Sequence, residues 1–229
     1  MKRSYRIVTI AVFCLAFFGF AAVSDSQAQV VREILKRMDD HYQKLSSLRA
    51  GVKMDKFNSQ LGEHDLSEGT TIYIPQKGRD AAFRVNWTKP QEESLSVVNK
   101  KYVIYRPKLN QAYVGTVSKA QNSAKANSAL AFMNMSRAQL QDNFTVNYLG
   151  QENVSATPTW HLKLIPKTAA SYKTAELWVD GNGMPIQAKV TENNNDTTTV
   201  LLFDLQPNVS IRASEIPIKL PKGVKIIQS

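Results

Sequence analysis

The feature that most constrains this chain is a long series of short segments in which apolar and polar residues alternate. The alternation is clearest in residues 48–55, 160–164, 175–179 and 186–190. A period of two puts successive side chains on opposite faces of a β-strand, so each segment predicts a strand with one buried face. Further strands are expected around residues 72–74, 79–87, 95–98, 102–105, 111–114, 144–149 and 198–203 and over the last few residues.

Turn-forming sequences separate these segments. Asp180–Gly183 (DGNG) lies between two of them, and Glu192–Asp196 (ENNND) follows the second. Such sequences favour tight turns. About ten to eleven short strands joined by short loops therefore predict a mainly β chain, folded as an antiparallel meander without a second domain.

Residues 30–48 come before the strands and follow a different period. Their apolar residues recur at steps of three and four, and the residues between them are charged or polar. This pattern predicts an amphipathic helix of about four turns with one face to bury. The apolar residues of this face are Val31, Ile34, Leu35, Met38, Tyr42 and Leu45.

The first 28 residues have the three parts of a secretory signal peptide. Lys2, Arg3 and Arg6 are basic, residues 7–23 are apolar, and Ser26-Gln27-Ala28 supplies small residues for cleavage. A retained membrane anchor is the alternative, but a run of roughly 17 apolar residues is short of the ~20 that cross a bilayer. We expect cleavage of residues 1–28, secretion of the chain and a single domain over residues 29–229.

The chain is basic, with a formal net charge of +10 that would fall to +8 with the loss of residues 1–28. The basic residues are scattered, without a run of five and without a nucleic-acid-binding motif. We expect no nucleic acid partner, and the charge would suit anionic membrane surfaces or ligands. Cys14 is the one cysteine and lies in the expected signal, so the mature chain would form no disulfide.

A second helix is expected in the middle of the chain, over Ser123 to Asp142. This segment is rich in Ala, Leu, Met and Gln, which favour helix. Its centre, residues 129–135, is apolar almost all round, so it would be covered on every side. Two interpretations are open: ordinary core packing, or a lid over a ligand cavity that Met and Phe would line adaptably.

Motifs of catalysis or metal binding are missing from the sequence. His41, His64 and His161 each lack a second histidine at ligand spacing, and His161 is expected to face solvent. The acidic pairs at 39–40 and 92–93 are adjacent residues that point apart. With no nucleophile, phosphate-binding or dinucleotide motif, we expect neither an enzyme nor a bound cofactor or metal.

The order of these elements resembles the periplasmic lipoprotein carrier family, LolA. The resemblance covers almost the whole mature chain: signal, amphipathic helix, antiparallel strands, helical insert, more strands and a terminal P-x-G-V. Asp80, where family members often have proline, and the short end after Ile227 depart from the family pattern. The segments that carry it are LKRMDDHYQKLSSLRAGVKM, R-x-x-x-F (79–83) followed by Pro90, PQEESLSVVNKKYVIYRPKLNQA, LWVDGNGMPIQAKV and IPIKLPKGVKI.

The resemblance implies a strongly curved, incomplete antiparallel barrel, with helices over an apolar cavity that binds an acyl chain. The implied function is a monomeric carrier that shuttles lipoproteins or related lipids from the inner to the outer membrane. An inner-membrane lipoprotein-release transporter and an outer-membrane acceptor would be its partners, with transient contact to the membrane surface. The lining residues expected from strand parity and lid position are Val52, Met54, Ile72, Ile74, Phe83, Val85, Trp87, Leu130, Phe132 and Met133.

Other functions remain compatible with the same sequence. The fold could serve as a lipid- or lipoprotein-sensing module that acts through a protein partner, or as a carrier of glycolipids or other lipids. A hydrolase with an unrecognised site is a third possibility, which the missing motifs disfavour.

Two arginines in GRDAAFRVNW (78–87) differ in the face they are expected to occupy. Parity puts Arg79 with Phe83, Val85 and Trp87, and puts Arg84 on the polar face as a solvated charge. The resemblance implies that Arg79 is a latch that holds the lid closed. The alternative is that Arg79 only extends from the rim into solvent.

Overall fold

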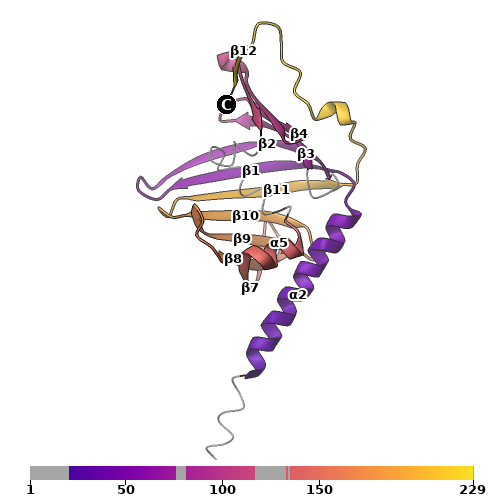
Figure 1. Ribbon diagram of the computed structural model, residues 1–229, viewed down its shortest axis with the longest axis vertical. Helices are drawn as coiled ribbons and strands as arrows, with labels where there is room; N and C mark the ends of the chain where they lie inside the picture. The colour runs from indigo at the N-terminus through magenta and orange to yellow at the C-terminus, as the bar shows by residue number, and fades with distance from the viewer. Residues whose placement is uncertain (1–20, 76–80, 117–132, 134, 229) are drawn as a thin grey trace, which may run out of the picture.

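One open, curved sheet forms the body of the protein in the computed structural model, which describes residues 21–75, 81–116, 133 and 135–228 (Figure 1). Within these residues the sheet has twelve strands in the order β12-β6-β5-β4-β3-β2-β1-β11-β10-β9-β8-β7. Neighbouring strands are antiparallel, except that β12 is parallel to β6. The prediction of a mainly β, antiparallel and incomplete barrel is confirmed, with one strand more than expected.

The elements lie where the periodicity predicts them, but several have other bounds: α2 begins at Ala21 and ends at Lys44, and β2 begins at Glu63. No helix in the described part of the chain is long and apolar enough to span a membrane. The helices are α2 (Ala21–Lys44), η2 (Pro107–Leu109), α5 (Arg137–Asn143) and η3 (Ala213–Glu215). The strands are β1 (Leu48–Asn58), β2 (Glu63–Pro75), β3 (Ala81–Lys89), β4 (Glu93–Val98), β5 (Lys101–Arg106), β6 (Gln111–Thr116), β7 (Phe144–Val154), β8 (Thr157–Pro166), β9 (Tyr172–Asp180), β10 (Pro185–Glu192), β11 (Thr197–Pro207) and β12 (Lys225–Gln228).

The two faces of the sheet follow from the strand register. We call the face that carries Val52, Val85 and Leu177 the inner face, because these residues belong to the largest core cluster. Cross-strand pairs such as Leu162 with Leu177, and Leu177 with Ala188, continue this face from β8 to β10. The other side is the outer face.

Helix α2 packs on the inner face with the residues that its period predicts. Ile34, Leu35 and Met38 are buried in the main core, and the helix contacts β7. Gly183 in the β9–β10 turn lies so close to α2 that an added Cβ would be 2.2 Å from the Arg37 carbonyl oxygen. A glycine there allows both this close approach and a φ of +86°.

Helix α5 is the described end of the expected mid-chain helix, most of which lies outside the described residues. It begins with a capping box, in which Ser136 accepts a hydrogen bond from the Gln139 N–H and the Gln139 side chain accepts one from the Ser136 N–H. Leu140 is fully buried in the main core. Helix is therefore confirmed for this end, and the choice between lid and core packing stays open.

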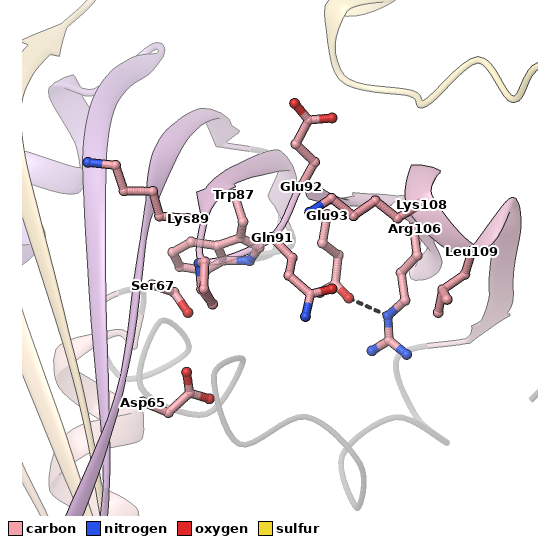
Figure 2. A pocket seen from close by; sticks show the side chains of 11 residues that line it. Asp65, Ser67, Trp87, Lys89, Gln91, Glu92, Glu93, Arg106, Lys108 and Leu109 are labelled. Carbon is pink, nitrogen blue, oxygen red and sulfur yellow. Dashed lines mark hydrogen bonds and ion pairs between the residues drawn. The ribbon is translucent and has the colours of Figure 1, made fainter.

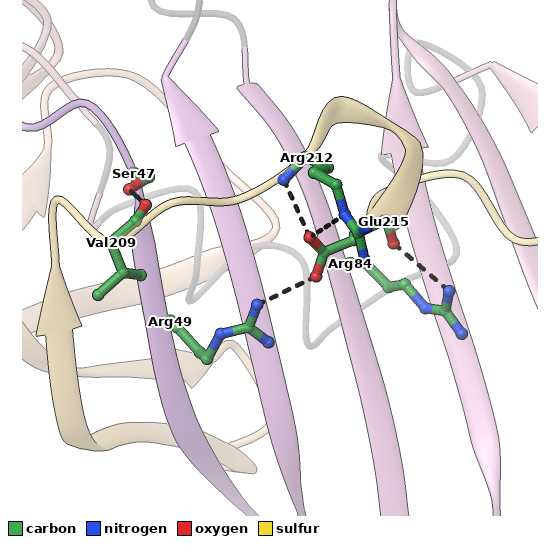
Figure 3. Close-up of polar contacts among 6 residues, drawn as sticks. All are labelled: Ser47, Arg49, Arg84, Val209, Arg212 and Glu215. Carbon is green, nitrogen blue, oxygen red and sulfur yellow. Dashed lines mark hydrogen bonds and ion pairs between the residues drawn. The ribbon is translucent and has the colours of Figure 1, made fainter.

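The C-terminal segment crosses the outer face of the sheet after β11. Glu215 accepts a hydrogen bond from Arg49 at 3.1 Å, and its backbone carbonyl accepts one from Arg84 at 3.5 Å (Figure 3). Ile216 is buried against Ile72 and Ala82. This segment gives the outer face of β2 and β3 its own small apolar cluster, and it then reaches β6 as β12 (Figure 1).

Candidate functional site

An apolar strip runs across the inner face of β2 to β5. Tyr73 on β2 pairs with Phe83 on β3, and Phe83 pairs with Val97 on β4. Val97 in turn pairs with Tyr102 on β5. Because directly paired residues point to the same side of a sheet, these side chains form one continuous row.

A parallel row lies one step along the same strands. Val85 pairs with Leu95, and Leu95 pairs with Ile104, which pairs with Tyr113 on β6. Together with Trp87, the two rows make up what we call the inner strip: Tyr73, Phe83, Val85, Trp87, Leu95, Val97, Tyr102, Ile104 and Tyr113.

Burial differs along the inner strip. Val85, Leu95, Val97 and Tyr102 are buried, whereas Tyr73, Phe83, Trp87, Ile104 and Tyr113 are only partly buried. Phe83 contacts both the main core and the smaller cluster formed by Leu95, Val97 and Tyr102. Tyr73 and Trp87 also pack against the main core, so the inner strip is continuous with the core through partly buried aromatic side chains.

A pocket of about 300 Å³ lies beside the inner strip, near the end of β3, the start of β4 and the end of β5 (Figure 2). We call it the rim pocket. Trp87 belongs to both the inner strip and the rim pocket, so the two are adjoining parts of one surface. Side chains from β2, β3 and β4 and from the β5–η2 segment surround the pocket, and most of them are charged or polar. A ligand with an apolar part and a polar end matches this arrangement.

An ion pair forms one wall of the rim pocket. Arg106 Nε donates to Glu93 Oε2 at 2.5 Å, and the Arg106 guanidinium lies 5.1 Å from the centre of the Tyr113 ring. The hydrogen bond to Glu93, together with the charge of that carboxylate, raises the pKa of Arg106. Figure 2 shows the two terminal nitrogens of Arg106 turned away from Glu93.

Most of the expected lining residues that the structure describes lie on the inner face. Val52 and Met54 are buried in the main core, and Phe83, Val85 and Trp87 belong to the inner strip. Met133 packs against the same core. Leu130 and Phe132 lie outside the described residues.

Ile72 and Ile74 are corrections to the expected lining. The register pairs Ile72 with Arg84 and Ile74 with Ala82, which puts both isoleucines on the outer face. They pack with Ile216 of the C-terminal segment and not with Val52. Both faces of β2 are apolar here, so alternation alone could not show which residues point inward.

The prediction for Arg79, as latch or as rim residue, also lies outside the described residues. Arg84 occupies the face that parity assigned, but it is not simply solvated. Its Nε donates to Asn86 Oδ1 at 2.8 Å, and its Nη1 donates to the Glu215 carbonyl. The C-terminal segment makes this contact, and the periodicity of β3 contains no sign of it.

His161 is a further correction. It lies on the outer face as expected, but its side chain is only 15% exposed. It stacks on Trp178 with ring centres 4.2 Å apart and contacts the carboxylates of Glu152 and Glu176. The described residues contain no group of three or more His, Cys, Asp or Glu that could hold a metal ion.

Sequence reasoning missed Arg106 and Glu93. Both residues lie in segments that alternate, and the β4–β5 hairpin between them brings them together. The available signal was the turn at residues 99–100, because a hairpin centred there sets the two strands side by side in register.

Solved structures share this fold at low sequence identity. An uncharacterized conserved protein from Thermus thermophilus aligns with a TM-score of 0.57 and 13% identity, over 87% of this chain and 99% of its own. MucB in the MucA/MucB complex of Pseudomonas aeruginosa aligns with a TM-score of 0.51 and 13% identity, over 82% of this chain and 60% of its own. This chain thus spans about three fifths of MucB, and the likeness in both cases is one of fold.

No curated protein matches the sequence. The family model described as "Outer membrane lipoprotein carrier protein LolA" matches residues 76–216, which include β3 to β11 and therefore most of the inner strip. That match covers more than half of the chain. The protein belongs to the LolA family.

Proposed function

We propose that this protein is a non-catalytic carrier that holds acyl chains on the inner strip. The observation that carries the proposal is the partly buried aromatic surface of Tyr73, Phe83 and Trp87, which is continuous with the core and ends at the rim pocket. A row of this kind supplies apolar contact along its length, while the rim pocket supplies contacts for a polar end.

The energy available from such binding suits a carrier. Each methylene that leaves water contributes roughly 0.8 kcal/mol, so half-burying a chain of about twelve carbons would supply roughly 5 kcal/mol. Binding of this size is reversible, because part of it is offset by the freedom that the guest loses. A carrier needs that reversibility in order to release its cargo.

Family membership supports a more specific form of the proposal. The cargo would be lipoproteins or related lipids, which the protein would take from the inner membrane to the outer membrane through the periplasm. A signal peptide over residues 1–28 would export the chain, and a transporter and an acceptor in the two membranes would be its partners.

A second candidate is a sensing module that acts through a protein partner. The observation that favours it is the fold shared with MucB, which was solved in complex with MucA. Such a module would form a stable protein complex and would not transfer cargo between membranes. The two candidates therefore differ in whether cargo moves.

Two measurements on the native exported protein test the proposal. Organic extraction followed by mass spectrometry should recover acylated molecules, and addition of the protein to inner-membrane vesicles should release lipoproteins or lipids into solution. Recovery of no acylated molecule would overturn the carrier. Recovery of lipid together with a stable partner and no release would favour the sensing module.

A transfer defect in one of two matched variants would locate the cargo. Phe83→Ala removes an aromatic ring from the inner strip, whereas Phe203→Ala removes one that pairs with Gly51 on the outer face. We expect Phe83→Ala to reduce release several-fold and Phe203→Ala to leave it near the wild-type level. Equal effects of the two substitutions would contradict a site on the inner strip.

A further inference from the structure

The two rows of the inner strip reach different distances across the sheet. One row ends at Tyr102 on β5, because Tyr102 pairs with Gly115 on β6, which has no side chain. The other row continues, because Tyr113 on β6 pairs with Ile227 on β12, and directly paired residues point to the same side of a sheet. We call this second row the long row; its members are Val85, Leu95, Ile104, Tyr113 and Ile227.

The two isoleucines of β12 differ in the face they occupy and in their burial. Ile227 is partly buried on the inner face, whereas Ile226 is 56% exposed on the outer face. In the described sheet β12 is the outermost strand, at the end opposite to β7 (Figure 1). Asn110 fixes the start of this strand, since its side chain donates to the Gly223 carbonyl and its own carbonyl accepts from the Lys225 N–H, both at 3.0 Å. A fixed strand therefore presents Ile227 at the end of the long row.

Polar residues border the long row along one side. On β4, β5, β6 and β12 the next inner-face residue along the strand is, in turn, Glu93, Arg106, Gln111 and Lys225. Hydrogen bonds hold this border in place: Arg106 donates to Glu93 (Figure 2), and the Tyr113 hydroxyl donates to Gln111 at 3.2 Å. Apolar surface is therefore short along these strands and long across them, from β3 to β12. An acyl chain that follows this surface crosses the strands.

The long row also defines a length. Neighbouring strands lie about 4.8 Å apart, so the four steps from β3 to β12 span roughly 19 Å. An extended hydrocarbon advances roughly 1.3 Å per carbon, as follows from carbon–carbon bonds of about 1.5 Å. The long row thus matches about fifteen carbons, and its last step, from Tyr113 to Ile227, corresponds to about four of them.

We propose that Ile227 forms the far end of the acyl-chain site, so that β12 sets the length of the acyl chain that this protein binds most tightly. The chain lies across the strands from β3 to β12. Chains of about fifteen carbons contact the whole long row, and further carbons extend past Ile227 and add little affinity. This inference rests on the proposed acyl-chain carrier, because the inner strip must hold the chain whose length β12 selects.

The test measures affinity as a function of chain length. Saturated fatty acids from decanoic acid to eicosanoic acid compete with a fluorescent fatty acid for the full exported protein. In the wild type, affinity should rise by about fourfold for each two methylenes, the gain expected from half-burying them. This rise should continue to hexadecanoic acid and then level off.

Two substitutions on β12 form a matched pair. Ile227→Asp puts a charge at the end of the long row, and Ile226→Asp puts the same charge on the outer face of the same strand. Ile227→Asp should weaken the binding of hexadecanoic acid about tenfold, which is the contribution of about four half-buried methylenes, and leave dodecanoic acid near the wild-type level. Ile226→Asp should leave both affinities unchanged. Ile227→Ala adds no charge and should show a smaller loss of the same kind.

Each result decides between the proposals. The length inference would be overturned, and the carrier left standing, by affinity that rises evenly to eicosanoic acid or by an unchanged affinity of Ile227→Asp for hexadecanoic acid. Equal losses for dodecanoic and hexadecanoic acid in Ile227→Asp, or equal effects of Ile226→Asp and Ile227→Asp, would also overturn it. Failure of the fluorescent probe and of every fatty acid to bind would count against the carrier itself, and the inference would fall with it.

Discussion

The two halves of the sheet bury their inner faces to very different extents. On β7–β11, Leu162, Leu177 and Ala188 are 0% exposed beneath α2 and α5. On β2–β6, several large inner side chains, among them Phe83 and Trp87, remain partly exposed. The same alternating pattern thus produces a fully buried centre in the β7–β11 half, where Tyr148 and Trp160 are partly buried, and more partly exposed apolar surface in the β2–β6 half.

Helices account for this difference. Ile34, Leu35 and Met38 of α2 fill the inner side of the β7–β11 half, and the β9–β10 turn lies directly against the backbone of α2. The β2–β6 half is supported from its outer face, where the C-terminal segment packs on Ile72 and Ala82. Support from behind fixes these strands from the face opposite to the one on which we propose that the acyl chain binds. Stability should therefore concentrate in one half and binding in the other.

The largest expected effect comes from removing a fully buried side chain. Leu177→Ala should lower the free energy of unfolding by about 3 kcal/mol, because it leaves a cavity in a fully buried site. Ile104→Ala in the inner strip should lower the free energy of unfolding by about 1 kcal/mol, since part of that side chain already contacts water. Urea unfolding followed by circular dichroism measures both values. A cost for Ile104→Ala equal to that of Leu177→Ala would contradict the contrast between the halves.

The next largest loss of stability should come from disturbing the contact between α2 and the β9–β10 turn. Gly183→Ala forces a Cβ to within 2.2 Å of the Arg37 carbonyl oxygen and also strains a backbone with φ of +86°. We expect a loss of about 2 kcal/mol in the free energy of unfolding. Gly181→Ala is the matched control, because a Cβ at Gly181 has open space. A neutral Gly183→Ala would mean that α2 can shift away from the turn without cost.

His41 in α2 makes the β7–β11 half sensitive to acid. Burial lowers its pKa from 6.5, and none of the described residues hydrogen bonds to its Nε2 atom. As the pH falls below about 6.5, the unfolded chain takes up a proton that the folded protein resists, so stability decreases. The urea midpoint of His41→Gln should therefore fall less between pH 7 and pH 5 than that of the wild type. Parallel pH profiles would exclude this role of His41.

The smallest expected effect on stability comes from Glu215 in the C-terminal segment. It depends on a lower pH range than the effect of His41. Hydrogen bonds from the Arg212 backbone and the Arg49 side chain lower the pKa of Glu215. The resulting stabilisation is present above the ordinary carboxyl pKa of about 4.3 and is lost as the pH falls through the lowered value. Glu215→Gln should be slightly less stable than the wild type at pH 7, and this difference should shrink as the pH falls below about 4.3. A difference that does not change with pH would place the effect in packing and not in charge.

The sequence predicted the β7–β11 half better than the β2–β6 half, for a physical reason. Strands β8, β9 and β10 have one clearly apolar side, so alternation defined their inner faces correctly. Strand β2 is apolar on both sides near Ile72, because a segment much later in the chain covers its outer face. The Arg106–Glu93 pair depends on hairpin register, and the His161–Trp178 stack depends on the pairing of β8 with β9. Contacts between distant segments leave no mark on local periodicity.

Tryptophan quenching by a fatty acid that carries bromine along its chain tests the central claim most directly. Bromine quenches an indole that it touches, and the chain has three tryptophans, of which Trp87 lies on the inner strip and Trp178 on the outer face. The account predicts strong quenching in the wild type and in Trp178→Phe, and loss of most of that quenching in Trp87→Phe. Full quenching in Trp87→Phe, or its loss in Trp178→Phe, would show that the acyl chain binds elsewhere.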